Sequence, residues 1–259
     1  MMVEAILVTK SRFANDIREW INWHLDRCGF DKIYIIDNDS ECDVESITKE
    51  YGDKIEYTKI NGFCRQLQVY DSVINNVSTA DWIMPIDDDE FLDLGPYKNV
   101  KKFISHYSSI YPLESMFAIR WKHLFPKEFH SERLGSKVLD YCTEENEVIA
   151  ELFKLGDNGI KCIVKRDGKV HYYEASECPI KCHVPSHTNC EYARSLTGEI
   201  CKYNVCYNTS GEDVRLIHCR YKGYEEWKYK IEHIPYVSDN VPKTRYREYK
   251  FNKILELLK

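Results

Sequence analysis

The sequence predicts an α/β fold, with a mostly parallel central sheet flanked by helices and a smaller mixed region towards the C-terminus. Short apolar segments alternate with amphipathic helical segments over the first 95 residues, as in chains built from β-α-β units. The second and fourth apolar segments each end in aspartate, which is expected where strands open into a ligand-binding edge. The 259 residues, 43% hydrophobic and 30% charged, suffice for one large or two small globular domains.

Four strands and three helices are predicted in the first 95 residues. The strands are Glu4–Thr9, Lys32–Asp37, Lys54–Ile60 and Asp81–Asp87, and the helices between them are 17–28, Val44–Tyr51 and Arg65–Val77. In the first helix, apolar residues recur every three or four positions from Ile17 to Cys28. Gly29 is expected to end this helix, and His24, on the apolar stripe, is expected to be a hydrogen-bonded core residue.

After Leu94-Gly95-Pro96 the pattern becomes less regular. The predicted elements are helices at Val100–Tyr107, Glu144–Leu155, Tyr224–His233 and Thr244–Lys259, strands at Ser115–Phe125 and Val214–Cys219, and a hairpin of Ile160–Arg166 with Lys169–Ala175. The final helix is basic around an apolar stripe. It is therefore either a solvated helix or a weak contact with an anionic membrane surface or a partner.

Charge and composition argue against some classes of protein. The formal net charge of −6 gives no general attraction to nucleic acid. Met1-Met2-Val3-Glu4 lacks the basic start of an export signal, and no window approaches the ~20 apolar residues of a membrane span. We therefore expect a cytoplasmic protein, either in solution or at the inner face of the membrane, whose 11 cysteines are mostly reduced.

The most informative stretch is Asp87-Asp88-Asp89-Glu90, which follows the apolar run Trp82–Ile86 and precedes Phe91-Leu92. Four adjacent carboxylates at the end of a buried strand repel one another unless a cation lies among them. Oxygen ligands favour Mg²⁺, Mn²⁺ or Ca²⁺. The alternative is a solvated acidic turn, against which the apolar residues on both sides argue. Together with Asp37 at the end of the second strand, this cluster suggests a nucleotide site, with one carboxylate for ribose or base and another for a metal on the phosphates. Neither GxGxxG nor a P-loop is present.

The chain resembles the GT-A glycosyltransferases, in particular the bacterial family 2 and family 92-like enzymes. The ordered segments that carry the resemblance are Thr9-Lys10, Ile17–Leu25, Ile35–Ser40, Arg65–Asp71 and Ile86–Leu92, with weaker matches at Lys161–Val164 and Ile217–Lys222. The resemblance implies a single GT-A domain over 1–259, divided into a nucleotide-sugar-binding half (1–95), a metal-completing and acceptor-binding half (96–235) and a C-terminal helix (236–259).

The resemblance also implies roles for individual residues. Asp89 would be the direct ligand of Mn²⁺ or Mg²⁺, and His218 the second protein ligand. The implied donor-binding residues are Thr9, Lys10, Arg12, Asp37, Arg65, Gln66, Asp87, Asp88 and Lys222. Lys222 would steady the diphosphate of a UDP-linked donor, and the acceptor would be a glycan or lipid-linked oligosaccharide in surface polysaccharide synthesis.

The sequence departs from the family 2 pattern in the catalytic base. No copy of the usual Glu-Asp pair follows the acidic cluster, although an inverting transfer needs a base near the acceptor hydroxyl. The candidates are Asp140, Glu144, Glu145, Glu147 and His187, and their spacing in the sequence does not distinguish among them. We predict the base to be one of Asp140, Glu147 and His187.

Two other hypotheses remain open at this point. Cys178, Cys182, His183, His187 and Cys190 could hold a structural zinc in a non-catalytic binding module, although their spacing matches no common zinc pattern. The four acids could instead serve a two-metal phosphohydrolase or nuclease, which would require a basic nucleic-acid track that the early segments lack.

Overall fold

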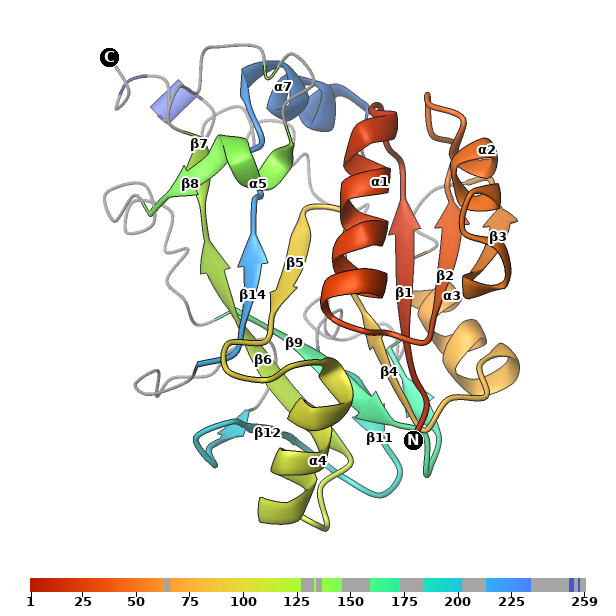
Figure 1. The fold of residues 1–259 in the computed structure, drawn as a ribbon, viewed down its shortest axis with the longest axis vertical. Helices are drawn as coiled ribbons and strands as arrows, with labels where there is room; N and C mark the ends of the chain where they lie inside the picture. Colours follow the sequence, from red (N-terminus) through yellow and green to blue (C-terminus); the bar gives the residue numbers. More distant parts are fainter. Residues whose placement is uncertain are drawn as a thin grey trace.

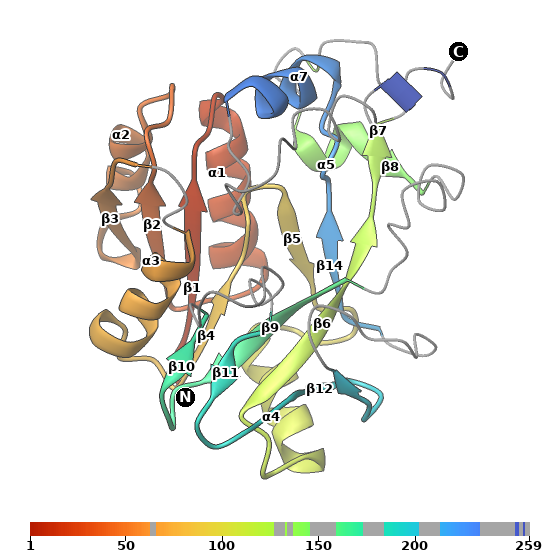
Figure 2. The ribbon, with the colours of Figure 1, turned by 180° about the vertical axis from the view of Figure 1, so that it is seen from behind.

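A computed structural model describes residues 1–62, 66–126, 133, 137–145, 159–172, 184–201, 213–233, 252–253 and 256. The main sheet has the strand order β13-β12-β6-β9-β4-β1-β2-β3, with β14 joining β5 to β6. β1, β2, β3 and β4 are parallel, whereas β9 is antiparallel to both of its neighbours. The predicted α/β class, with a mostly parallel half and a mixed half, is confirmed (Figures 1 and 2).

Four strands of the first half follow the predictions closely: β1 (Val3–Thr9), β2 (Lys32–Asp37), β3 (Ile55–Lys59) and β4 (Trp82–Pro85). A fifth strand, β5 (Glu90–Asp93), was not predicted. Those of the second half are β6 (Met116–His123), β7 (Phe125–Pro126), β8 (Cys142–Glu144), β9 (Ile160–Lys165), β10 (Val170–His171), β11 (Ser186–His187), β12 (Ala193–Ser195), β13 (Ile200–Cys201) and β14 (Arg215–His218).

Helices cover both faces of the sheet. They are α1 (Ala14–Asn22) continuing into the π-turn η1 (Trp23–Arg27), α2 (Val44–Lys49), the 3-10 turn η2 (Gly52–Lys54), α3 (Gln66–Ser72) continuing into the π-turn η3 (Val73–Val77), α4 (Val100–Ile110), α5 (Val138–Tyr141) and α7 (Tyr224–His233). One core cluster joins α1, α2 and α4 to one face of the sheet, and a second joins α3 to the other face. None of the described helices is both long enough and apolar enough to cross a bilayer.

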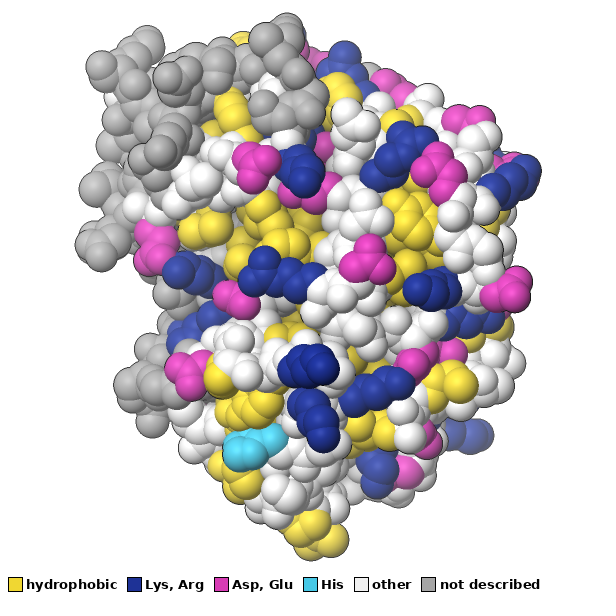
Figure 3. Space-filling model, in the orientation of Figure 1, with side chains coloured by type: hydrophobic (Ala, Val, Ile, Leu, Met, Phe, Trp, Pro, Cys, Tyr) yellow, Lys and Arg dark blue, Asp and Glu magenta, His cyan; other side chains and the backbone are white. Residues whose placement is uncertain are grey.

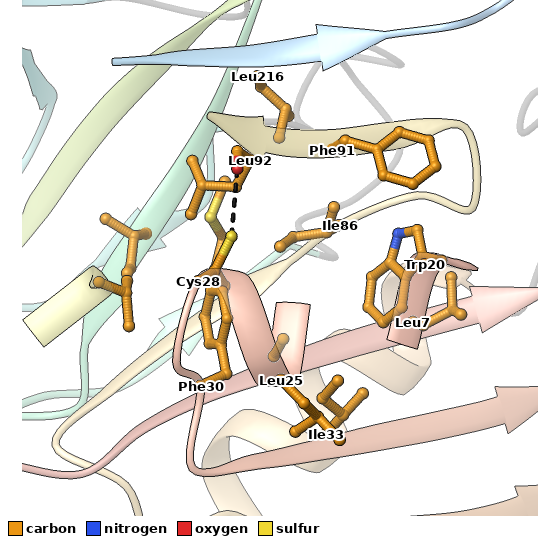
Figure 4. Close-up of a cluster of buried hydrophobic side chains, with 14 of the residues drawn as sticks. Leu7, Trp20, Leu25, Cys28, Phe30, Ile33, Ile86, Phe91, Leu92 and Leu216 are labelled. Carbon is orange, nitrogen blue, oxygen red and sulfur yellow. Dashed lines mark hydrogen bonds between the residues drawn. The ribbon is translucent and has the colours of Figure 1, made fainter. Parts of the chain in front are cut away.

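The first helix packs as its sequence pattern predicts. Ile17, Trp20, Ile21, Leu25 and Cys28 are buried, and Figure 4 shows Trp20, Leu25 and Cys28 facing β1 and β5. Cys28 Sγ donates to the Leu92 carbonyl at 3.2 Å, the contact drawn as a dashed line in Figure 4. Gly29 follows the π-turn with φ of +74°, a conformation that glycine adopts without strain.

His24 is the buried, hydrogen-bonded core residue that its position predicts. Its Nδ1 lies 2.8 Å from the Trp20 carbonyl, and its Nε2 accepts from the Leu92 amide at 3.4 Å. Burial lowers the pKa of His24 to about 3, so the ring is neutral in the folded protein.

The predicted hairpin around Asp167-Gly168 is wrong. β9 pairs with β4 and β6, while β10 pairs with β11. The physical reason is burial: five of the six residues of β9 are buried, as expected for a strand inside the sheet between two neighbours.

The start of the predicted helix at Glu144–Leu155 is wrong, because Glu144 is the last residue of β8. Residues 146–155 lie outside the described residues. The predicted C-terminal helix also lies almost entirely outside them.

β14 is the element that brings the two halves of the chain together. It runs between β5 and β6, so that His218 lies opposite Glu90 on one side and His123 on the other. This register places His218, from near the end of the described chain, beside the acidic turn between β4 and β5 (Figure 1).

On the face drawn in Figure 3, basic and acidic side chains are interspersed, without a broad basic track.

Candidate functional site

The acidic cluster forms a tight turn between β4 and β5. The Asp87 amide donates to Glu90 Oε2 at 2.9 Å, and the Glu90 amide donates to the Asp87 carbonyl at 3.1 Å. Trp20 Nε1 on α1 donates to the same carbonyl at 2.9 Å. This contact from α1 therefore holds the turn in place at the carboxyl end of the sheet, where ligand sites of α/β proteins form.

Asp89 and His218 lie together, as the resemblance predicts. His218 Nε2 is 3.5 Å from Asp89 Oδ1, and their side chains are 8% and 4% exposed. Burial lowers the pKa of His218 despite the opposing charge of Asp89, which favours the neutral imidazole that metals bind. A cation from α7 completes the arrangement: Lys230 Nζ lies 2.6 Å from Asp89 Oδ2. Burial works against the charge of Asp89, but Lys230 and His218 hold its pKa well below the ordinary value.

The ring of His218 is positioned by aromatic neighbours on β6. Its centroid lies 4.7 Å from the ring of Trp121 and 5.0 Å from that of His123. Gly159 permits this packing, because a Cβ there would lie 2.0 Å from Trp121 Cε3. Burial lowers the pKa of His123 to about 2, so this ring is neutral. Among the described residues, neither ring nitrogen of His123 has a hydrogen-bond partner.

Asp88 connects the acidic turn to the loop after β1. Thr9 Oγ1 donates to Asp88 Oδ2 at 2.9 Å, and Lys222 donates to the Asp88 carbonyl at 3.1 Å. Burial raises the pKa of Asp88, and the charge of Asp89 adds to this effect, although Lys222 opposes it. Lys222 also lies 3.2 Å from Asp16 Oδ2 at the start of α1. Thr9, Asp88 and Lys222 thus come together, as the resemblance implies.

Asp87 contacts a buried lysine for which no role was predicted. Lys161 Nζ on β9 lies 2.9 Å from Asp87 Oδ2 and 3.5 Å from Glu90 Oε2, and its side chain is 2% exposed. Gln66 Nε2 and Tyr70 Oη donate to the other oxygen of Asp87, at 2.7 and 3.1 Å. Burial raises the pKa of Glu90 to about 8 even though Lys161 opposes the shift. The carboxylate of Asp87 is therefore held from within the protein on both of its oxygens.

Asp37 ends β2 beside the same edge. Its side chain accepts from Tyr57 Oη at 3.1 Å and from the Ser40 amide at 2.8 Å, and the residue is 2% exposed. Ser40 Oγ in turn accepts from the Ser11 amide at 2.8 Å. These contacts hold the loops after β1 and β2 together as one wall.

A pocket opens between the loop after β1, the acidic turn, the segment after β14 and α7. Its lining residues are Lys10, Ser11, Arg12, Phe13, Asp16, Asp88, Asp89, Arg220, Lys222, Glu226, Trp227, Tyr229 and Lys230. Five of them are Lys or Arg and four are Asp or Glu, so the pocket mixes both charges in a site that α7 partly covers. Such a site can neutralise a polyanionic ligand while carboxylates hold a cation beside it.

No protein-family model matches the sequence, and no curated protein matches it. Some solved structures are similar in fold. TarS of S. aureus is 12% identical with a TM-score of 0.47, and the match covers 98% of this chain but 43% of that one. TarS 1-349 in complex with UDP-GlcNAc, also 12% identical, gives 0.46 over 98% of this chain and 72% of that one. GalNAc-T7 with UDP, GalNAc and Mn²⁺ is 9% identical and gives 0.36 over 50% of this chain and 23% of that one. Likenesses this distant concern the path of the backbone alone.

The residues present fit a divalent cation. Two ligands adjacent on an octahedral ion lie about 3 Å apart at metal–ligand distances of about 2.1 Å, and Asp89 Oδ1 and His218 Nε2 lie 3.5 Å apart. Among the described residues, no group of three His, Cys, Asp or Glu side chains is arranged to hold a metal. A cation at this pair would therefore need further ligands from water or from a bound phosphate.

Of the predicted donor-binding and metal-binding residues, Lys10, Arg12, Asp88, Asp89 and Lys222 line the pocket, whereas Thr9, Asp37, Gln66, Asp87 and His218 are not among its lining residues. Arg65 and Glu147 lie outside the described residues. Asp140 lies on α5 with an exposed side chain. Arg12 lines the pocket, and its guanidinium lies over the rings of Phe13 and Tyr229.

His187 is not brought to the site, in contrast to its prediction as a candidate base. It lies on β11, with Nε2 2.9 Å from the carbonyl of Lys165, a residue that pairs with the first residue of β4. The acidic turn follows the other end of β4. The second ring nitrogen, Nδ1, accepts from the Asn189 amide at 3.1 Å. Both nitrogens thus contact backbone groups, of Lys165 and of Asn189, which also argues against His187 as a zinc ligand. Cys178, Cys182 and His183 lie outside the described residues.

Proposed function

We propose that this chain is a metal-dependent glycosyltransferase of the GT-A type that transfers a sugar from a UDP-linked donor to a glycan or lipid-linked acceptor. The observation that carries the proposal is the pairing of Asp89 with His218 at 3.5 Å, at the edge of a pocket bounded by the strand ends of a mostly parallel sheet. The UDP-linked donor is what the resemblance of the sequence to GT-A glycosyltransferases implies, on the ordered segments from Thr9-Lys10 to Ile86–Leu92.

The chain's own residues suggest how a donor would be held. Asp37 and the loop from Thr9 to Arg12 would contact the nucleoside, because they form the wall at the ends of β1 and β2. Lys222 would contact the diphosphate, since its ammonium lies between Asp16 and the acidic turn. When bound at Asp89 and His218, a divalent cation would stabilise the negative charge that develops on the departing phosphate.

We propose that the base for an inverting transfer is either Asp140 or Glu147. Of these two residues, the structure describes Asp140. Its neighbour Tyr141 lies beside Gly223, where an added Cβ would be 3.7 Å from Tyr141 Cε1. Gly223 directly follows Lys222, so α5 lies next to a residue of the pocket. A base there could reach an acceptor hydroxyl that enters beside the donor.

The two-metal phosphohydrolase or nuclease is less well supported by the geometry. That chemistry needs several carboxylates facing a shared pair of ions. Asp87 and Glu90 face the buried Lys161, and of the four acids Asp88 and Asp89 line the pocket. A site with two of its four acids engaged in the core favours a single cation.

The test is cation and donor binding by an Asp89→Asn variant. At Mn²⁺ and UDP concentrations about 100-fold above the dissociation constants, binding should raise the Tm of the wild-type protein by about 5–10 °C. Asp89→Asn should lose this shift and the Mn²⁺-dependent release of UDP from a UDP-sugar, because the carboxylate that holds the cation is gone. Asp53→Asn, a change at an exposed aspartate of η2, is the control. An Asp89→Asn protein that keeps both responses would refute the assignment.

A further inference from the structure

The cation beside Asp89 in this structure is a side chain of α7. Lys230 Nζ lies 2.6 Å from Asp89 Oδ2, and the opposite oxygen of the carboxylate faces His218. The Asp89 side chain is 4% exposed, and a carboxylate buried to this extent requires a counter-charge. Lys230 supplies that counter-charge at the carboxylate proposed to hold the metal.

Lys230 can leave Asp89 without unfolding α7. Its side chain is 29% exposed and lines the same pocket as Lys222. The helix itself is anchored elsewhere, by buried Trp227 and by Glu226, which accepts from Arg133 Nε at 2.7 Å. A flexible lysine on an anchored helix can exchange partners by rotation of its own side-chain bonds.

We propose that Lys230 and the divalent cation bind Asp89 in turn. Lys230 neutralises Asp89 before the donor arrives, and the cation then displaces its ammonium group, which pairs with the diphosphate at the mouth of the same pocket. This inference rests on the proposed function, because it takes Asp89 as the cation ligand. It adds to that function a donor-binding residue on α7 and an order of events.

The exchange predicts that cation and nucleotide bind cooperatively. A cation that arrives alone must separate Lys230 from Asp89 and leave the ammonium without its partner, so it binds weakly. With a nucleoside diphosphate present, the displaced ammonium gains a new anionic partner, and the cation binds more tightly. Linkage requires that the cation strengthen nucleotide binding by the same factor.

The experiment is an electron paramagnetic resonance titration of the full chain with Mn²⁺, with and without UDP. The variant is Lys230→Met, which keeps much of the side chain's length and removes the charge. The matched control is Lys228→Met, an exposed lysine of the same helix. In the absence of UDP, Lys230→Met should bind Mn²⁺ at least tenfold more tightly than the wild-type protein. The factor by which UDP tightens Mn²⁺ binding should fall at least fivefold, and Lys228→Met should match the wild type in both measurements.

The outcomes separate this inference from the proposed function. If Lys230→Met and its backup, Lys230→Gln, retain the wild-type Mn²⁺ affinity while Asp89→Asn abolishes binding, the exchange is refuted and the proposed function stands. If the wild-type protein and both lysine variants bind no Mn²⁺ even with UDP present, both proposals are refuted. Circular dichroism spectra that match the wild type confirm that the compared variants are folded.

Discussion

Lys161 shows how one buried side chain can hold the acidic turn in place. Its ammonium group lies within 3.5 Å of both Asp87 and Glu90, and its own side chain is 2% exposed. A charge in that position would be costly alone, and each carboxylate would be costly without it. The three groups therefore stabilise one another, and the turn that carries Asp88 and Asp89 is built on them.

Replacing Lys161 with methionine should lower the free energy of unfolding by about 3 kcal/mol, near the lower end of the range for breaking a buried pair. The loss is moderated because burial raises the pKa of Glu90 to about 8, so Glu90 is mostly protonated at pH 7 and Asp87 is the carboxylate left without its counter-charge. Urea unfolding at pH 7 measures the change. Lys165→Met on the same strand, where the lysine is 41% exposed beside Asp167, should cost at most about 1 kcal/mol. Equal losses in the two variants would contradict the role assigned to Lys161.

His24 should make the protein less stable in acid. The unfolded chain protonates this ring near pH 6.5, whereas burial lowers its pKa to about 3 in the folded state. Between these values the unfolded state binds the extra proton, so the stability due to His24 is present above pH 6.5 and is lost as the pH falls towards 3. In His24→Gln, the slope of unfolding free energy against pH should decrease by about 1.4 kcal/mol per pH unit over pH 4.5–6. His106→Gln, at an exposed histidine of α4, is the control, and an unchanged slope in His24→Gln would show that the ring titrates normally.

At the scale of elements, α7 is fastened to α1 by an ion cluster. Arg133 Nη2 donates to both oxygens of Asp16 on α1, at 2.6 and 2.8 Å, and its Nε donates to Glu226 on α7. The Arg133 and Asp16 side chains are 6% and 4% exposed, and that of Glu226 is 14% exposed. The cluster therefore determines where α7 lies over the pocket.

Arg133→Met should loosen α7 without unfolding the sheet. Removal of the guanidinium leaves two nearly buried carboxylates close together, and burial already raises the pKa of Glu226. Amide hydrogen exchange of residues 224–233 should accelerate at least about tenfold, corresponding to about 1.4 kcal/mol of local stability, while β1 and β2 remain protected. Arg18→Met, which breaks a pair that is 39% and 49% exposed, provides the comparison. Unaltered exchange across α7 would mean that other contacts hold it.

Local patterns predicted the elements of the first half well. The helical period of the apolar residues from Ile17 to Cys28 and the two ends of β2 depend on neighbours in the chain, as do the bounds of α7 in the second half, which match the prediction. The hairpin at Asp167-Gly168 was predicted by the same kind of argument and was wrong, because β9 pairs with strands more than thirty residues away in sequence. Pairing between distant strands depends on the packing of the whole sheet, which a local pattern does not contain.

At the scale of the whole molecule, the site combines predicted and unpredicted residues for the same reason. Asp89 and His218 could be anticipated from the resemblance, and the register of β14 against β5 brings them together. Lys161 and Lys230 could not, since a single lysine on a strand or helix has many possible partners until the tertiary fold selects one. His187 was predicted as a candidate base from its residue type alone. The fold places it on β11, at the far end of the sheet from the acidic turn (Figure 2).

The insertion of β14 between β5 and β6 has a consequence for the protein during its synthesis. A nascent chain can complete the first four parallel strands, and with them three aspartates, long before residue 218 leaves the ribosome. Until that strand docks, the acidic turn lacks its imidazole, and α7 and its lysine are also missing. Under the proposed function, an unfinished copy cannot retain the cation, because one of its two protein ligands has not yet been made.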